Sequence, residues 1–218
     1  MSLEKNNNVQ VKEGYYKRRG YNTLERFISY FYQIDSITNL KDVSSILEIG
    51  PGNKLVSKEL MDIGFSVTTC DFDEKVFPDV VADVRSLPFQ KESFDCVMAC
   101  QILEHIPFAD FEKVVSDIAN ITKKYAVISL PERHVGFNLV LKFPFIQTLF
   151  KRKFFDISIK LPIKFKGFKE SDQHYFEIDY FTTSKRKIVE VFERHFHIEK
   201  VFNPPLNKYH RFYILKKK

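Results

Sequence analysis

Short apolar segments alternate with amphipathic segments between residues 44 and 131, and this alternation restricts the possible folds more than any other feature. Residues 54–64 and 108–124 have helical periodicity. Strands that alternate with helices at short spacing predict a parallel sheet with helices on both faces. The expected strands are SSILEIG (44–50), FSVTTCD (65–71), DVVADV (79–84), SFDCVMAC (93–100) and YAVISLP (125–131).

The two ends of the chain add to this α/β pattern. An N-terminal amphipathic helix is expected after Asn22 or Thr23, either of which can cap it. Its apolar residues at helical spacing are Leu24, Phe27, Ile28, Phe31 and Ile34. Near the C-terminus, residues 182–196 predict a helix capped by Thr182 or Thr183. Two strands, HIEKVF and HRFYIL, follow it. The connection between them is short enough for a hairpin, so the last strand is expected to be antiparallel.

The composition agrees with a single globular domain. Of 218 residues, 44% are hydrophobic, which is enough to form a sizeable core. No apolar run approaches the ~20 residues of a membrane-spanning helix. The polar N-terminal residues lack the apolar core of a secretory signal, and we therefore expect a cytoplasmic protein. Cys70, Cys96 and Cys100 form no paired framework, and buried free thiols are expected.

The stretch ILEIGPGNKL (46–55) places a G-x-G loop between the first strand and the helix that follows it. Gly50 and Gly52 allow a sharp turn and the close approach of a ligand. Doubly wound sheets bind ligands at this end of the strands. The third glycine of the dinucleotide fingerprint is missing, because Leu55 stands in its place. A plain turn therefore remains an alternative on this evidence alone.

Two carboxylates near the loop favour a ligand that has a ribose but no pyrophosphate. Asp71 ends the second strand about twenty residues after the glycines, where a ribose-binding acid is expected. Glu48 precedes the loop, where a carboxylate would repel a pyrophosphate but would attract an ammonium group. S-adenosylmethionine has an ammonium, a sulfonium and a ribose, and it lacks phosphate. It therefore suits both positions.

Together these segments resemble a class I S-adenosylmethionine-dependent methyltransferase of the small-molecule, methyltransferase type 11-like group. The matching motifs are E-x-G-x-G, D-x-D, A-D-x-x-x-L-P-F, F-D-x-V and L-E-H-I, in the family's order. The resemblance implies a Rossmann-like, seven-stranded, mostly parallel sheet ordered 3-2-1-4-5-7-6. The implied parts of this single domain are an N-terminal helical segment (1–40), a cofactor-binding core (41–131), a cap inserted after strand five (132–176) and a C-terminal helix with strands (177–218).

The resemblance also implies which residues bind S-adenosylmethionine. They are Glu48, Gly50 and Gly52 for the methionine moiety, Asp71 for the ribose, Phe72, Asp83 and Val84 for the adenine, and Ala99, Cys100 and Gln101 for the methyl-donor side. Lys54 departs from a glycine that is common at its position. Residues 103–106 (LEHI) either pack at the start of a helix or contact the cofactor.

Methyl transfer to oxygen or nitrogen can require a general base. The candidates are Glu132 and His134 after the fifth strand, and His174 and Glu177 in DQHYFEID. No set of metal ligands is expected. The tetrapeptide NPPL (203–206) resembles the NPPY of amino-group methyltransferases that act on nucleic acid or protein. It does not follow strand four, so we interpret it as a proline-stiffened turn.

The expected acceptor is a small molecule, such as a saccharide or another secondary metabolite, methylated on oxygen or nitrogen. The net charge of +6 also permits an anionic partner. Residues 142–169 interleave basic and Phe residues. They could form a lid packed on the domain, a peripheral membrane surface near a lipid-borne acceptor, a nucleic-acid surface, or a site for a small anion. A nucleic-acid acceptor such as RNA is less expected, because NPPY is missing after strand four. A non-catalytic binding module that kept the fold is a further alternative.

Overall fold

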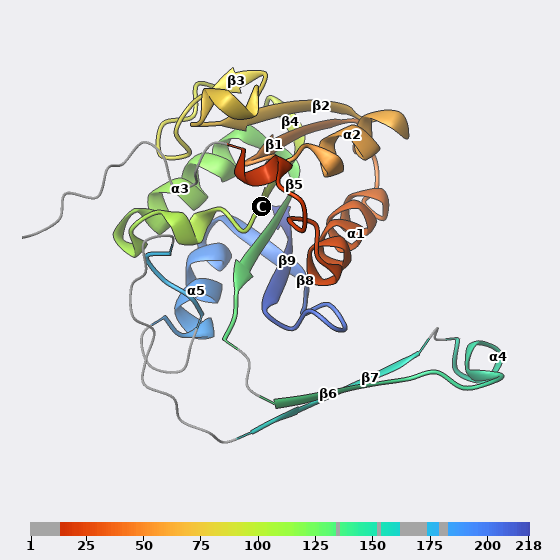
Figure 1. Ribbon diagram of the computed structural model, residues 1–218. Coiled ribbons are helices and arrows are strands. Elements are labelled where there is room, and N and C mark those ends of the chain that lie inside the picture. Colours follow the sequence, from red (N-terminus) through yellow and green to blue (C-terminus); the bar gives the residue numbers. More distant parts are fainter. Residues whose placement is uncertain (1–13, 134–135, 152–153, 162–173, 179–182) are drawn as a thin grey trace, which may run out of the picture.

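The computed structural model describes residues 14–133, 136–151, 154–161, 174–178 and 183–218. They form an α/β core from which a two-stranded ribbon extends (Figure 1). The core sheet has seven strands in the order β3-β2-β1-β4-β5-β9-β8. Its strands are β1 (Ser45–Ile49), β2 (Ser66–Asp71), β3 (Val80–Val81), β4 (Phe94–Cys100), β5 (Thr122–Pro131), β8 (Phe196–Phe202) and β9 (His210–Lys217).

The strand directions confirm the predicted topology. The strands β3, β2, β1, β4 and β5 pair in parallel, and β9 pairs antiparallel with both β5 and β8. Since β8 and β9 are the sixth and seventh strands of this sheet, its order is the expected 3-2-1-4-5-7-6. NPPL lies in the turn between β8 and β9, as predicted.

Helices cover both faces of the sheet, and each face has its own hydrophobic cluster. Leu47 and Ile49 of β1 face a cluster that includes residues of α3 and α5. Ile46 and Met98 face the cluster that includes residues of α1 and α2. Strands buried on both faces have continuous apolar runs, which is why the sequence pattern was clear. The described helices are α1 (Leu24–Thr38), α2 (Leu55–Asp62), α3 (Phe108–Ile121), α4 (Ile146–Phe150) and α5 (Lys185–His195), with the 3-10 turns η1 (Tyr15–Lys17), η2 (Glu74–Val76) and η3 (Leu103–His105).

Two smaller predictions can be compared with this core. All three cysteines are free, as expected. The cap of α5 is Ser184, whose hydroxyl accepts a hydrogen bond from the Lys187 amide at 3.4 Å. The prediction of Thr183 as the cap was wrong, because that residue is buried and forms a bridge with Ile178. Thr182 lies outside the described residues.

The helix α1 begins after the predicted cap Thr23, but three of the five residues of its apolar stripe do not face the core, whereas Ile34 packs against it. Leu24, Phe27 and Phe31 are 65%, 49% and 56% exposed. Its buried side chains are instead Ser29, Gln33, Ser36 and Ile37. Ser29 and Gln33 face inward because they line the cavity described below. Amphipathicity therefore predicted the helix but not the face that is buried.

The insertion after β5 contains a ribbon of β6 (Gly136–Leu141) and β7 (Phe155–Lys160), with α4 at its far end (Figure 1). Phe143, Phe145 and Phe150 are exposed rather than packed on the domain, which contradicts the lid interpretation for this part. Residues 162–173 lie outside the described residues, so a cap over the acceptor site stays a prediction. Every helix of the described residues is too short or too polar to span a bilayer.

Candidate active site

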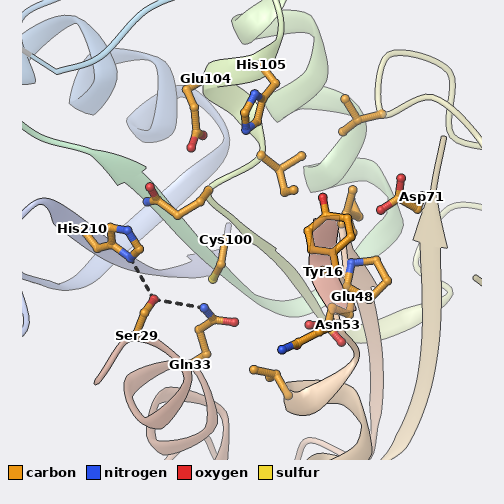
Figure 2. Close-up of a pocket in the computed structure, with 18 of the residues that line it drawn as sticks. Tyr16, Ser29, Gln33, Glu48, Asn53, Asp71, Cys100, Glu104, His105 and His210 are labelled. Atoms are coloured by element: carbon orange, nitrogen blue, oxygen red, sulfur yellow. Dashed lines mark hydrogen bonds between the residues drawn. The ribbon is translucent and has the colours of Figure 1, made fainter. Parts of the chain in front are cut away.

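A cavity of about 870 Å³ lies at the carboxyl ends of β1, β2 and β4 (Figure 2). Nine of the ten predicted cofactor-binding residues line it, and they come from four separate segments of the chain. They are Glu48, Gly50, Gly52, Asp71, Phe72, Asp83, Val84, Cys100 and Gln101. The fold therefore brings the predicted set together, although no contact with a cofactor follows from this placement alone.

The G-x-G loop packs closely against the residues that follow β4. Gly50 has φ +72°, and its amide donates a hydrogen bond to the Cys70 carbonyl at 2.8 Å. A Cβ built on Gly50 would lie 1.9 Å from Cδ1 of Ile102. Lys54, which replaces a glycine common in the family, has the left-handed φ of +60° that glycine adopts most readily.

Glu48 lies beneath this loop and is 4% exposed. Its Oε2 has no hydrogen-bond partner among the residues that the structure describes. Burial raises the pKa of its carboxyl group to about 7. A cationic ligand group would give this oxygen a partner and would favour the ionised carboxylate. The residues present therefore fit a ligand with an ammonium group.

Asp71 ends β2 as predicted, and its buried carboxylate accepts a hydrogen bond from the Asp73 amide at 3.0 Å. Tyr16 of η1 lies between Glu48 and Asp71 (Figure 2). Burial and then the charge of Asp71 raise the pKa of Tyr16 to about 12. The sequence shows a tyrosine cluster here but gives no sign that it reaches the cavity, because the contact joins segments more than fifty residues apart.

The remaining predicted cofactor residues differ in how they meet the cavity. Asp83 forms a two-point ion pair with Arg85, with Nε to Oδ1 at 2.9 Å and Nη2 to Oδ2 at 2.6 Å. Gln101 has a left-handed φ of +58° and donates from its side chain to Oγ of Ser129 at 3.2 Å. Ala99 is fully buried in the hydrophobic core and is not among the lining residues. Its side chain points away because consecutive strand residues face opposite sides of the sheet.

Opposite the G-x-G loop, the cavity is lined by polar side chains that the sequence did not indicate. His210 of β9 lies 2.8 Å from Oγ of Ser29 through Nδ1, and Gln33 donates to the same oxygen at 3.2 Å (Figure 2). Burial lowers the pKa of His210 to about 4, so this imidazole is neutral at physiological pH. These residues explain why α1 presents its polar side to the interior.

The structure separates the four general-base candidates. His174 lines the cavity. Its Nδ1 atom lies 2.9 Å from Oε1 of Glu177. The hydroxyl of Tyr209 donates to the same Glu177 oxygen at 2.5 Å. Burial would raise the pKa of Glu177, but its hydrogen bonds to His174 and Tyr209 lower it. His134 lies outside the described residues.

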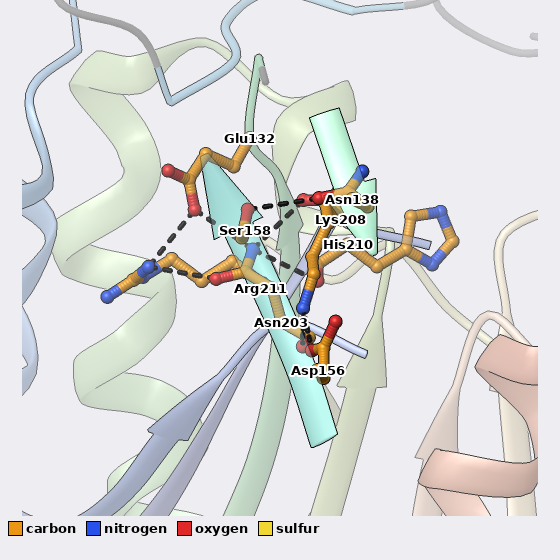
Figure 3. A network of polar contacts seen from close by, with 8 residues as sticks. All are labelled: Glu132, Asn138, Asp156, Ser158, Asn203, Lys208, His210 and Arg211. Atoms are coloured by element: carbon orange, nitrogen blue, oxygen red, sulfur yellow. Dashed lines mark hydrogen bonds and ion pairs between the residues drawn. The ribbon is translucent and has the colours of Figure 1, made fainter. Parts of the chain in front are cut away.

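Glu132 belongs to a structural network rather than to the cavity lining (Figure 3). Its oxygens accept from Lys185 at 2.5 Å, Asn203 at 2.9 Å and Arg211 at 3.0 Å. Burial opposes ionisation, but Lys185, Asn203 and Arg211 hold the pKa of Glu132 at about 2. A carboxylate this acidic is a poor base near neutral pH. Asn203, the first residue of NPPL, thus has a structural role, because its side chain donates to Glu132.

A seven-stranded sheet of this order, with the E-x-G-x-G loop and Asp71 at one cavity, is the arrangement of the Rossmann-like methyltransferase fold. Residues 47–130 match the family model described as a methyltransferase domain. The chain thus carries a methyltransferase domain over residues 47–130. A search of curated proteins found no match.

Solved structures with this fold include several small-molecule methyltransferases. One is 1,6-didemethyltoxoflavin-N1-methyltransferase from Burkholderia thailandensis, at TM-score 0.60 and 13% identity, covering 94% of this chain and 84% of that chain. Another is magnesium protoporphyrin IX methyltransferase from Synechocystis PCC 6803, at TM-score 0.57 and 14% identity, covering 93% and 91%. The N-methyltransferase NodS from Bradyrhizobium japonicum WM9 has TM-score 0.60 and 7% identity, covering 95% and 94%. All three were solved with S-adenosylhomocysteine.

Proposed function

We propose that this enzyme methylates an oxygen or nitrogen atom of a small-molecule acceptor, such as a saccharide or another secondary metabolite. The observation that carries the cofactor assignment is the buried Oε2 of Glu48, which lacks a partner among the described residues and shares a cavity with Asp71. An ammonium group and a ribose on one ligand would suit both carboxylates. The small-molecule acceptors of the solved relatives support the acceptor class.

The cofactor would be held by the residues that already line the cavity. Glu48 would accept from the ammonium group, Asp71 from the ribose hydroxyls, and Phe72 would pack against the adenine. Gly50 packs directly against Ile102, another residue of the cavity lining, and only a residue without a side chain fits there. When bound, S-adenosylmethionine supplies a methyl group on a positively charged sulfur. The protein's task is then to align the acceptor and to exclude water.

For the acceptor end of the cavity, we propose that His174 acts on the reacting atom and that Glu177 orients its ring. The support is the 2.9 Å contact between them and the place of His174 in the cavity wall. As a base, His174 would take the proton that leaves an oxygen or nitrogen acceptor. An imidazole ring can take up and release a proton, which suits that role.

Replacing Asp71 by alanine is expected to weaken binding of S-adenosylhomocysteine by about 1–3 kcal/mol, the range for losing charged hydrogen bonds. Calorimetric titration measures the effect, with S-adenosylmethionine and NADH as the companion ligands. Asp62→Ala is the matched control, because it removes the same charge from an exposed site on α2. Equal affinity of the two variants would place Asp71 outside the site. A preference of the native protein for NADH would contradict the cofactor assignment.

We also propose that the ribbon of β6 and β7 contacts an anionic membrane surface, which would suit a lipid-borne acceptor. Residues directly opposite in the ribbon share a face, so one face is apolar throughout. Its residues are Phe137, Leu139, Leu141, Phe155, Ile157 and Ile159. Five of these six are exposed. Lys142 and Lys151 flank the turn of the ribbon and complement an anionic surface.

Phe137→Asp is expected to reduce binding of the full chain to vesicles that contain phosphatidylserine, because it places a charge on the apolar face. Asn138→Asp adds the same charge on the opposite face and should reduce binding much less. Co-sedimentation with anionic and with neutral vesicles measures both effects. If the native chain does not sediment with anionic vesicles, or if the two variants behave alike, the ribbon does not contact membranes in this way. A dimer that Phe137→Asp dissociates would show that a second copy covers the face instead.

A further inference from the structure

We propose that Glu104, His105 and His174 bind a divalent transition-metal ion at the acceptor end of the cavity. The inference deepens the proposed methyl transfer and rests on it for the role of the ion. Each of the three residues offers one ligand atom, and these atoms lie within 4.8 Å of one another. All three residues line the cavity. The donor set of two imidazoles and a carboxylate suits zinc, cobalt, nickel or iron.

The fold holds the two contributing segments together. Glu104 and His105 belong to η3, directly after β4, and His174 comes some seventy residues later, after the ribbon. The amide of Tyr175 donates to the Glu104 carbonyl at 2.8 Å, which fixes the two segments side by side. The rings of His105 and His174 meet edge to face, with centroids 5.0 Å apart. Because the backbone already holds the three residues together, the ligand atoms could close around an ion through rotation of the side chains alone.

The carboxylate of Glu104 is the observation that calls for a cation. The residue is fully buried, and neither Oε1 nor Oε2 has a hydrogen-bond partner among the described residues. Figure 2 shows this carboxylate beside His105 at the cavity. A buried carboxylate without a partner is costly, and a metal ion would satisfy both oxygens. An organic ammonium could pair with Glu104 alone, but the two adjacent imidazoles favour a metal.

Glu177 has the position of an outer-shell partner. Its 2.9 Å contact with Nδ1 of His174 would orient that ring so that Nε2 serves as the ligand. The hydroxyl of Tyr209 in turn fixes Glu177. The carboxylate, histidine and metal would then form the triad that is common at such sites. A bound ion would polarise an acceptor oxygen or nitrogen and lower the pKa of its proton. His174 would then be a ligand in the metal-bound enzyme and the general base only in the metal-free enzyme, and the proton of an acceptor activated by the ion would leave to water.

Metal binding tests the inference without any acceptor. The full chain is stripped with a chelator and titrated with Zn²⁺ by calorimetry and with Co²⁺ by visible absorption. We expect one ion per chain and a visible spectrum of protein-bound Co²⁺. Glu104→Gln, which keeps the side-chain shape, and His174→Ala should each weaken binding by at least about tenfold, and Glu177→Gln should weaken it by about 10- to 100-fold. His197→Ala and Glu199→Gln are the matched controls, because both residues lie on β8 and outside the cavity lining.

Titration of the same samples with S-adenosylhomocysteine keeps the two proposals separate and shows that each variant is folded. If zinc and cobalt fail to bind while S-adenosylhomocysteine binds, the metal inference is wrong and the proposed function stands. Metal binding that Glu104→Gln and His174→Ala leave unchanged also overturns the inference. Loss of S-adenosylhomocysteine binding alone would contradict the proposed function instead.

Discussion

Gly50→Ala is expected to lower the free energy of unfolding by about 2–5 kcal/mol and to weaken binding of S-adenosylhomocysteine. Two costs combine at this position. The left-handed φ of +72° costs an alanine about 1–2 kcal/mol. The new Cβ would also lie 1.9 Å from Cδ1 and 2.6 Å from Cγ1 of Ile102, and overpacking of this kind costs about 1–3 kcal/mol. Urea unfolding and calorimetric titration measure the two effects.

Two variants separate the backbone cost from the collision. Gly64 also has a positive φ, +103°, but a Cβ there would meet nothing within 4 Å. Gly64→Ala should therefore show the backbone cost alone and leave cofactor binding unchanged. Ile102→Ala removes both colliding atoms, so the double variant should be more stable than the sum of the single effects predicts. Equal destabilisation by Gly50→Ala and Gly64→Ala would show that the loop has more room than the structure indicates.

Glu132→Gln is expected to lower the free energy of unfolding by about 1–3 kcal/mol at pH 7, because it removes the charge of a buried carboxylate that accepts hydrogen bonds from two partly exposed cations. Lys185 and Arg211 both contact this carboxylate, which is 3% exposed; Figure 3 shows the contact with Arg211. Glu190→Gln is the control: its ion pair with Arg186 is exposed, and exposed pairs contribute little. If Glu132→Gln lowers the free energy of unfolding no more than Glu190→Gln does, the network does not stabilise the fold.

The pH dependence of the same variant gives a second measurement. The folded-state pKa of Glu132, about 2, lies below its ordinary value of 4.5. The stabilising contribution is therefore fully present above the ordinary value and is lost as the pH falls from there towards 2. Glu132→Gln cannot undergo this loss. We expect the difference in unfolding free energy between native and variant proteins to shrink between pH 5 and pH 3, and a constant difference would contradict this.

The sequence predicted the core sheet well because its strands are buried on both faces and its helices alternate with them regularly. It also predicted that Glu48, Gly50 and Asp71 would lie at one cavity, because they stand at strand ends, where a parallel sheet gathers them at one edge. Ala99 marks the limit of this reasoning, since its side chain faces the core. For α1, the periodicity identified the helix, but the polar cavity decided which face is buried.

The residues at the proposed acceptor end of the cavity could be identified only from the tertiary structure. His174 meets Glu104 across some seventy residues, and His210 meets Ser29 across more than a hundred and eighty. No local pattern encodes such contacts, because they arise only when separate segments pack together. The sequence by itself therefore determined the alternating strands and helices and favoured the cofactor class, both of which follow from local periodicity and strand-end positions, while the strand order came from the resemblance to a family. Only the tertiary structure showed the Glu104, His105 and His174 cluster, the buried network at Glu132 and the exposed apolar ribbon, because long-range packing sets which side chains meet and which remain exposed.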